Sequence, residues 1–357
     1  MENFLFDSDV KNDRIDLDGP IDIRMKKLST ELDTFRYNLK GKTMDVSVSN
    51  AIRRTILQLI PIYGFNRKNI FIEHEKCKYM YNNDLIYNQI ETLPIYNIAN
   101  YFDLEDPETF LPEETQHAVF GNFSQERIPS RTETQENDER KKIFNIELML
   151  NVLNETNDNM FVTTHQAVLK IDNKISNSYK KHKAISIIVL KPGEEIHLRA
   201  VANLNISLED AAYEATTNVV SKEISTSEYE IIYETLNQLP TDIIFTKACT
   251  IMSKKLEKLQ KYIEDEYSHP EIDSNGHIEI QLYGETHTLG FLLSRALQKC
   301  DLVDKAGYYL PSPFINNVVI HYVTSKKNPI QVCIKVIKYL RRLFAHILNV
   351  AFVAANK

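Results

Sequence analysis

One structural pattern occurs twice in this chain, and it limits the folds that the chain can adopt. Residues 35–57 contain an alternating strand pattern ending in Leu-Lys-Gly, a short loop with Ser, and an amphipathic helix pattern that carries Arg54. Residues 278–297 repeat this order with Leu-Tyr-Gly, a loop with Thr, and a helix pattern that carries Arg295. A solenoid repeats every ~20–50 residues, whereas these copies stand near opposite ends of the chain. We therefore expect two related modules fused in one chain and packed together as a built-in dimer.

Further secondary structure follows from the spacing of apolar residues, which alternate in strands and recur every three or four positions in helices. The first module is predicted to contain strands over 35–39, 70–74, 84–90 and 228–234, a helix from the N-cap Ser47 to before Pro61, and a helix over 241–266 with Thr241 as N-cap. The second is predicted to contain strands over 278–282 and 318–323 and helices over 288–299 and 329–353. Strands over 144–150, 184–190 and 195–202 predict a separate β-rich unit.

The two long predicted helices have more apolar surface than one sheet can cover. Helix 241–266 has one apolar stripe, and helix 329–353 has two apolar rows, so each must also pack against another element. The chain is therefore predicted to be an α+β protein. Its two modules, each an antiparallel sheet covered by amphipathic helices, are expected to pack helix to helix as an intramolecular pseudo-dimer, with a β-rich insert in the first.

The charge distribution argues against a protein that reads nucleic-acid sequence. The chain has 357 residues and a formal net charge of −7, and its length favours two or three domains. Residues 272–357 carry a net positive charge and residues 1–271 a net negative one, whereas nucleic-acid binders usually concentrate positive charge. The pattern fits a protein with protein partners, and equally two solvated surfaces of different sign.

The four cysteines, Cys77, Cys249, Cys300 and Cys333, form no C-x-x-C pair, so neither a zinc cluster nor a redox motif is predicted. This usage favours a reducing, intracellular compartment. The first residues lack the basic-then-apolar pattern of a signal peptide. The apolar stretch 343–355 is too short to span a bilayer, which needs ~20 residues, and is predicted to be a buried helix end.

Catalytic motifs are scarce in the sequence. Glu285 and His287 stand close together before a predicted helix and suggest acid/base or metal chemistry. A metal site needs three or four ligands, so a helix-entry loop with local hydrogen bonds is the favoured interpretation of this pair. The sequence has no G-x-S-x-G, P-loop or G-x-G-x-x-G motif. We therefore predict no catalytic residue and no metal ligand.

The pair Arg53-Arg54 suggests an interface. A solvated helix face is the simpler interpretation, but the second module has Arg295 at the position that matches Arg54. Arginine suits protein interfaces because its planar guanidinium pairs with carboxylates in a bidentate manner.

Several segments together resemble the alpha-like subunits of RNA polymerases, which include bacterial alpha, archaeal subunits D and L, and the third-largest and eleventh eukaryotic subunits. Residues 35–57 resemble the first helix of the larger type, 83–95 the stretch before its inserted domain, and 228–259 its return to the dimerisation domain. Glu-Thr-His-Thr-Leu-Gly-Phe-Leu-Leu at 285–293 resembles the strongest motif of the smaller type, and 306–313 matches its loop. The chain resembles both subunits fused, the larger first.

The resemblance implies a non-catalytic assembly platform on which the two largest subunits of a DNA-directed RNA polymerase are held together. It implies that Asn50, Arg53 and Arg54 contact the second-largest subunit, and that the second module, through Arg295, contacts the largest. A small subunit of the same platform is a further expected partner, whereas direct sequence-specific nucleic-acid binding and membrane binding are not expected. The expected intramolecular dimer interface consists of Val48, Ile52, Ile56, Met252, Leu256, Leu259, Leu289, Leu293, Ile337, Leu340, Phe344 and Ile347.

Some residues depart from the family pattern. Many relatives hold zinc or an iron–sulfur cluster through cysteines in the insert, but residues 95–224 contain no cysteine, so no cofactor is expected. The fusion and the missing cluster suggest a large DNA virus, and hence a protein of the host cytoplasm or nucleus that is also a candidate for packaging in the virion. A two-domain enzyme using Glu285 and His287, or a generic protein adaptor, remains the alternative.

The expected domain boundaries follow from the changes in pattern. Residues 1–29 form a loosely ordered N-terminal arm, 30–94 and 225–268 the first module, 95–224 the inserted β-rich domain, 269–276 a linker, and 277–357 the second module.

Overall fold

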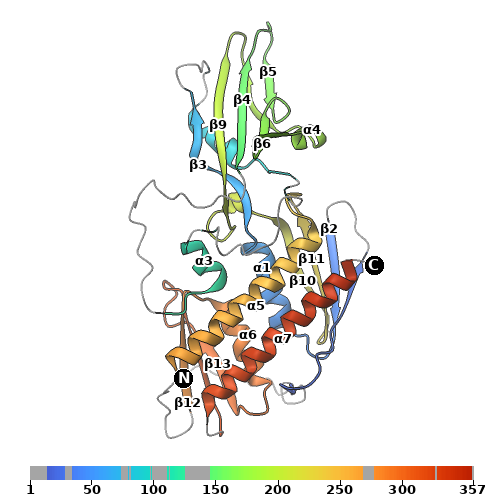
Figure 1. The fold of residues 1–357 in the computed structure, drawn as a ribbon, viewed down its shortest axis with the longest axis vertical. Helices are drawn as coiled ribbons and strands as arrows, with labels where there is room; N and C mark the ends of the chain where they lie inside the picture. The colour runs from blue at the N-terminus through green and yellow to red at the C-terminus, as the bar shows by residue number, and fades with distance from the viewer. Residues whose placement is uncertain are drawn as a thin grey trace.

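The computed structural model describes residues 14–28, 34–73, 79, 82–96, 98, 111, 113–124, 145–267, 277–325 and 328–355. It is a mixed α+β structure with antiparallel sheets. Figure 1 shows an elongated body that contains the two longest helices, and a β-rich lobe that extends from one end of this body.

The first sheet of the body has the strand order β1-β2-β11-β10, with every neighbouring pair antiparallel. Its strands are β1 (Arg24–Leu28), β2 (Thr34–Lys40), β10 (Thr216–Ser225) and β11 (Glu228–Thr235). Helix α1 (Val46–Gln58) packs against β10, β11 and the long helix α5 (Thr241–Glu266). The apolar stripe of α1 is buried in this packing, so the helix covers one face of the sheet.

The second sheet repeats this design with the order β12-β14-β13. It consists of β12 (His277–Tyr283), β13 (Lys305–Tyr309) and β14 (Asn317–Val323), and it is accompanied by α6 (His287–Gln298) and α7 (Pro329–Ala355). In both sheets the strand before the short helix lies beside the strand before the long helix, and a further strand, β10 or β13, lies beside the latter; β1 is an additional strand of the first sheet. The repeated sequence pattern therefore coincides with a repeated strand order.

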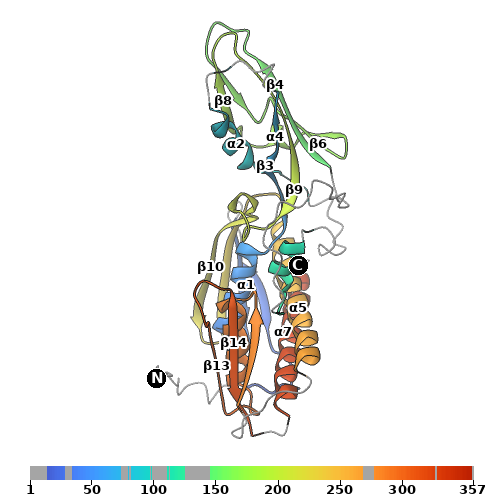
Figure 2. The same ribbon diagram turned by 90° about the vertical axis from the view of Figure 1, so that its left-hand side faces the viewer.

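The long helices α5 and α7 pack against each other, and the short helices α1 and α6 are also in contact. Figure 1 shows α5 and α7 side by side and running in opposite directions, and Figure 2 shows β10, β13 and β14 on the other side of the body. This packing covers the surplus apolar surface that the two helices were predicted to have. Among the described residues, no helix is both long and apolar enough to cross a membrane.

The lobe contains a sheet of order β3-β9-β4-β6-β7 and a pair β5-β8. The strands are β3 (Ile62–Ile72), β4 (Ile146–Leu153), β5 (Met160–Thr163), β6 (Val168–Ile171), β7 (Lys174–Ser176), β8 (Ser186–Leu190) and β9 (Glu195–Asn205). The short helices α2 (Asn83–Glu91) and α4 (Ser178–Lys181) belong to this part of the chain, and the 3-10 turn Ala211–Tyr213 lies against β3. Helix α3 (Glu113–Phe120) instead packs against α5 in the body.

The strand predicted over 84–90 is wrong, because this segment is helix α2. The side chain of Asn82 caps the helix by accepting a hydrogen bond from the backbone N–H of Asp84. Ile86 and Ile90, four residues apart, are buried on one face. The apolar residues therefore follow the period of a helix, and a strand interpretation of this short segment missed its N-cap.

Two N-caps differ from the prediction. Asp45, rather than Ser47, caps α1, because its carboxylate accepts from the backbone N–H groups of Ser47 and Val48. Helix α5 begins at Thr241 itself, with Pro240 at the capping position. Proline fits there because it needs no backbone N–H partner at a helix start.

Part of the predicted N-terminal arm is ordered. Residues 14–28, here termed the crossing segment, begin beside the end of α6, where Ile15 donates its backbone N–H to the carbonyl of Lys299 at 2.9 Å. They continue along α7, where Arg342 donates to the carbonyls of Leu17 and Gly19 at 3.0 Å each. They end as β1, paired with β2. The crossing segment thus contacts elements of both repeated units.

Candidate partner interface

Helix α1 presents Asn50, Arg53 and Arg54 away from its buried stripe, and all three are half-buried. Arg53 donates from Nε and Nη2 to Oδ1 of Asn50 at 3.1 and 2.7 Å. Arg54 donates from Nη2 to Oε1 of Gln58 at 3.4 Å. The predicted contact residues of the first module therefore lie together on one face of one helix.

The two guanidinium groups of this face are not neutralised within the described residues. Burial lowers the pKa of Arg53, and the adjacent Arg54 lowers it further. The Nε atom of Arg54 is buried and has no hydrogen-bond partner. Two adjacent cations whose hydrogen-bond acceptors among the described residues are amide oxygens can bind a carboxylate of another molecule.

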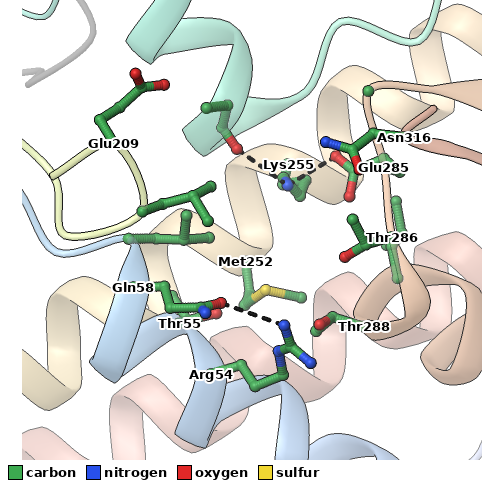
Figure 3. Close-up of a pocket in the computed structure, with 15 residues that line it drawn as sticks. Arg54, Thr55, Gln58, Glu209, Met252, Lys255, Glu285, Thr286, Thr288 and Asn316 are labelled. Carbon is green, nitrogen blue, oxygen red and sulfur yellow. Dashed lines mark hydrogen bonds and ion pairs between the residues drawn. The ribbon is translucent and has the colours of Figure 1, made fainter. Parts of the chain in front are cut away.

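A cavity of about 490 Å³ lies beside Arg54. Residues of α1, α3, α5, the loop at 208–209, the start of α6 and the β13–β14 loop line it. Figure 3 shows Arg54 at one end of the cavity, near Thr288, and Glu209 at the other end, pointing away from it. The cavity thus lies where both repeated units and the inserted segment meet.

Glu285 and His287 do not form a joint site. Glu285 is buried and forms an ion pair with Lys255 of α5 at 2.7 Å, and Lys255 also donates to the carbonyl of Ala118 at 3.4 Å. His287 is exposed, with Nδ1 3.3 Å from the hydroxyl of Tyr308. In the described part of the chain no group of three or more His, Cys, Asp or Glu side chains is arranged to hold a metal.

A second buried ion pair joins Asp45, the N-cap of α1, to Lys299 at the end of α6, at 3.0 Å. Burial by itself raises the pKa of Asp45, but the Lys299 ammonium and the hydrogen bonds from Ser47 and Val48 bring it below its ordinary value. The acid comes from the first unit and the base from the second, whereas the Glu285–Lys255 pair has the reverse arrangement. The two units are thus joined by reciprocal buried charges.

Arg295 of α6 occupies the position that matches Arg54 in α1, and it is also half-buried. It donates from Nη1 to Oε1 of Gln298 at 3.5 Å, and its Nε is buried without a hydrogen-bond partner. The structure places Arg295 on a different helix from the Asn50, Arg53 and Arg54 face. Its contact with a partner stays a prediction.

All twelve residues of the predicted dimer interface are buried, and they come from α1, α5, α6 and α7. They are Val48, Ile52, Ile56, Met252, Leu256, Leu259, Leu289, Leu293, Ile337, Leu340, Phe344 and Ile347. Residues of an interface and residues of an ordinary core are both buried. The assignment of these twelve residues to an interface therefore stays a prediction.

Sequence reasoning missed other residues of this region. Lys255 and Lys299 were not singled out, because their acidic partners lie far away in the sequence. Phe314 and Ile315 follow Pro-Ser-Pro in the β13–β14 loop and are exposed, Phe314 by 94%. The two prolines beside two large apolar residues could have been used to predict a stiff, exposed loop from the sequence.

Comparison with known proteins identifies the family. Residues 277–350 match the RNA polymerase Rpb3/Rpb11 dimerisation domain. A protein of Acanthamoeba polyphaga mimivirus, provisionally named as a DNA directed RNA polymerase subunit, is 44% identical over 338 residues, which cover 93% of this chain and 94% of that protein. The DNA-directed RNA polymerase subunit Rpo11 of Saccharolobus shibatae is 29% identical over 76 residues, 21% of this chain and 83% of that subunit.

These similarities confirm the predicted resemblance. They cover both the second unit, through the domain match, and nearly the whole chain, through the mimivirus relative. The chain belongs to the family of DNA-directed RNA polymerase subunits that contain the Rpb3/Rpb11 dimerisation domain.

Proposed function

We propose that this chain is the assembly-platform subunit of a multisubunit DNA-directed RNA polymerase and holds the two largest subunits together. The observation that carries the proposal is the 44% identity to the mimivirus relative over 93% of the chain. Subunits of this assembly type do not carry out the polymerisation reaction themselves. The separation of buried, ion-paired Glu285 from exposed His287 gives the alternative enzyme no support.

The platform we propose is an intramolecular pseudo-dimer of two alpha-like modules, 30–94 with 225–268 and 277–357, with 95–224 inserted in the first and 269–276 as the linker. Its support is the shared strand order of the two sheets, the contacts of α1 with α6 and of α5 with α7, and the reciprocal buried ion pairs. Strand β1 continues the first sheet beyond the predicted boundary at residue 29, and β10 extends it into the segment assigned to the insert. Strand β3 and helix α2, from the segment assigned to the first module, lie in the lobe instead.

The partner contacts we propose are Asn50, Arg53 and Arg54 for the second-largest subunit and Arg295 for the largest. The α1 face has two guanidinium groups without a carboxylate partner among the described residues, which favours an acidic surface on the protein that covers it. A small subunit of the same platform would complete the assembly.

The remaining proposals concern cofactor and place of action. The absence of cysteine from 95–224 supports a platform that holds neither zinc nor an iron–sulfur cluster in its insert. The mimivirus relative supports a viral polymerase acting inside the host cell, in the cytoplasm or the nucleus. We also propose that the protein is packaged in the virion.

Co-purification with the two largest polymerase subunits of the same genome tests the function. Tagged wild-type chain is expected to retain both subunits, and Arg53→Ala/Arg54→Ala is expected to retain less of the second-largest. The matched control is Lys335→Ala/Lys338→Ala, which removes two exposed cations from α7 instead. Thermal unfolding of each variant separates loss of binding from loss of fold.

Two outcomes would contradict the proposal at different levels. A folded wild-type chain that retains neither large subunit would overturn the platform function. Retention of the second-largest subunit that is equal for the wild type and the α1 variant would remove the α1 face from the interface and leave the function standing.

A further inference from the structure

We propose that the β13–β14 loop presents Phe314 and Ile315 as apolar anchors for the same protein partner that covers Arg54. The inference rests on the proposed function, under which this partner is the second-largest subunit. It assigns to that partner an apolar pocket that lies beside a carboxylate.

The first argument for the proposal is the exposure of the two side chains. Phe314 is 94% exposed and Ile315 is 63% exposed. No other large apolar side chain in the described part of the chain is as exposed as Phe314. Exposed large apolar groups next to one another cost solvation free energy and mark surfaces that bind a protein.

The loop that contains Phe314 and Ile315 is held in place by local contacts. Pro311 and Pro313 restrict its backbone, and the hydroxyl of Ser312 accepts a hydrogen bond from the backbone N–H of Phe314 at 3.2 Å. At the loop's end, the carbonyl of Asn316 accepts from the backbone N–H of Gly284 at 2.8 Å. A pre-organised loop loses little conformational entropy on binding, so its anchors can add affinity.

The position of the loop joins the anchors to Arg54. Asn316, two residues after Phe314, lines the same cavity as Arg54, and the half-exposed Leu208 lines it as well. Figure 3 shows Asn316 on the side of the cavity formed by the second module. One protein surface seated over this cavity would therefore meet the arginine and the loop together.

Charge complementarity indicates the chemistry of the partner. Lys255 in the same cavity is already paired with Glu285, whereas Arg54 donates to the Gln58 amide oxygen and its Nε has no hydrogen-bond partner. Of the two cations that line the cavity among the described residues, Arg54 is therefore the one without a carboxylate partner, and a carboxylate is its matching group. Aromatic residues and arginine are enriched at protein interfaces, and Phe314 and Arg54 are of these types.

The proposed binding surface is formed by residues from several parts of the chain. Arg54 comes from α1, Leu208 from the segment after β9, and Phe314 and Ile315 from the second module. A partner that needs all three would bind the paired modules and not either one alone.

The test compares Phe314→Ser/Ile315→Ser with wild type in binding to separately purified largest and second-largest subunits. Because the replaced side chains are exposed, the unfolding temperature should stay unchanged. The dissociation constant for the second-largest subunit should rise roughly tenfold or more, as expected when hot-spot side chains are removed. The matched control, Phe161→Ser/Ile175→Ser, removes the same residue types at 66% and 67% exposure from the lobe and should bind normally.

Each other outcome overturns the inference. Wild-type affinity in the loop variant, or an equal loss in the lobe control, would show that the loop is no specific anchor. A loss confined to the largest subunit would separate the loop from the partner of Arg54. If the wild-type chain binds neither large subunit, the proposed function itself fails. The wild-type measurement alone separates this result from a failure of the loop inference.

Discussion

At the scale of residues, the buried charges between the two repeated units are the interactions most sensitive to a single change. Asp45 and Lys299 have side chains that are 10% and 6% exposed and lie 3.0 Å apart. Each charge is tolerable in the interior only because the other is present, since an isolated buried ion is costly. The pair therefore couples the start of α1 to the end of α6.

The first prediction is that Lys299→Met lowers the free energy of unfolding by about 3–5 kcal/mol, because it leaves the Asp45 carboxylate buried without a counter-charge. Urea unfolding at neutral pH measures the loss. The double variant Asp45→Asn/Lys299→Met should recover much of it, since no charge remains and asparagine can still cap the helix. A single variant as stable as wild type would show that the pair is not buried in solution.

The second prediction concerns the pH dependence of the same pair. The folded-state pKa of Asp45 is lowered, so its stabilising contribution is present above the unfolded value of about 3.9 and is lost as the pH falls through the lower folded value. The neighbouring Tyr229 and Tyr339 have raised pKa values and stay neutral over this window.

Unfolding measured from pH 5 down to pH 2 should therefore show a decline that Asp45→Asn reduces. Equal acid sensitivity of both proteins would contradict the lowered pKa. Glu155 is an exposed carboxylate in the lobe, so Glu155→Gln is the control for a general effect of removing a carboxylate.

At the scale of elements, the crossing segment depends on a close approach of two backbones. An added Cβ at Gly41 would lie 1.7 Å from the carbonyl oxygen of Asp22, so no side chain fits there without movement of the segment. Gly41 thus permits the chain to pass beside the end of β2 before it forms β1.

The third prediction is that Gly41→Ala destabilises the protein by about 1–3 kcal/mol through overpacking and increases hydrogen exchange in β1. Hydrogen-exchange mass spectrometry with peptide resolution measures this effect. The neighbouring exposed Lys42, changed to Ala, is the control and should alter stability by less than about 0.5 kcal/mol. Unchanged protection of β1 in Gly41→Ala would contradict the tight passage.

The elements also show what the sequence can and cannot predict. Long helices such as α5 and α7, and strands with a clear alternation such as β11 and β12, follow directly from their periodicity. The short α2 was missed because its type depends on a cap and only two buried residues. Strand β1 was missed because three of its five residues are basic and it forms by pairing with β2. The ion pairs could not be predicted, because they depend on tertiary placement.

At the scale of the whole molecule, the connection through 268–276 is one of several links between the two repeated units. The packing of α5 on α7, the two buried ion pairs and the crossing segment also join them. The covalent link then acts mainly by keeping the units at a high effective concentration.

The fourth prediction is that a protease site placed within 268–276 can be cut without separating the pieces. Size-exclusion chromatography of the cut protein should give one peak at the position of the uncut chain, which serves as the standard. Two separate peaks under native conditions would show that the covalent connection is needed to hold the units together.

The crossing segment has a consequence for the order in which the chain reaches its final form. Ile15 pairs with the backbone beside Cys300, and at the ~5–20 residues per second of protein synthesis, residue 300 follows residue 15 by roughly 15–60 s. During that interval β1 can already pair with β2, but residues 15–19 lack the backbone of Lys299 and the side chain of Arg342 against which they pack. The part of the protein that leaves the ribosome first is therefore among the last to be fixed in place.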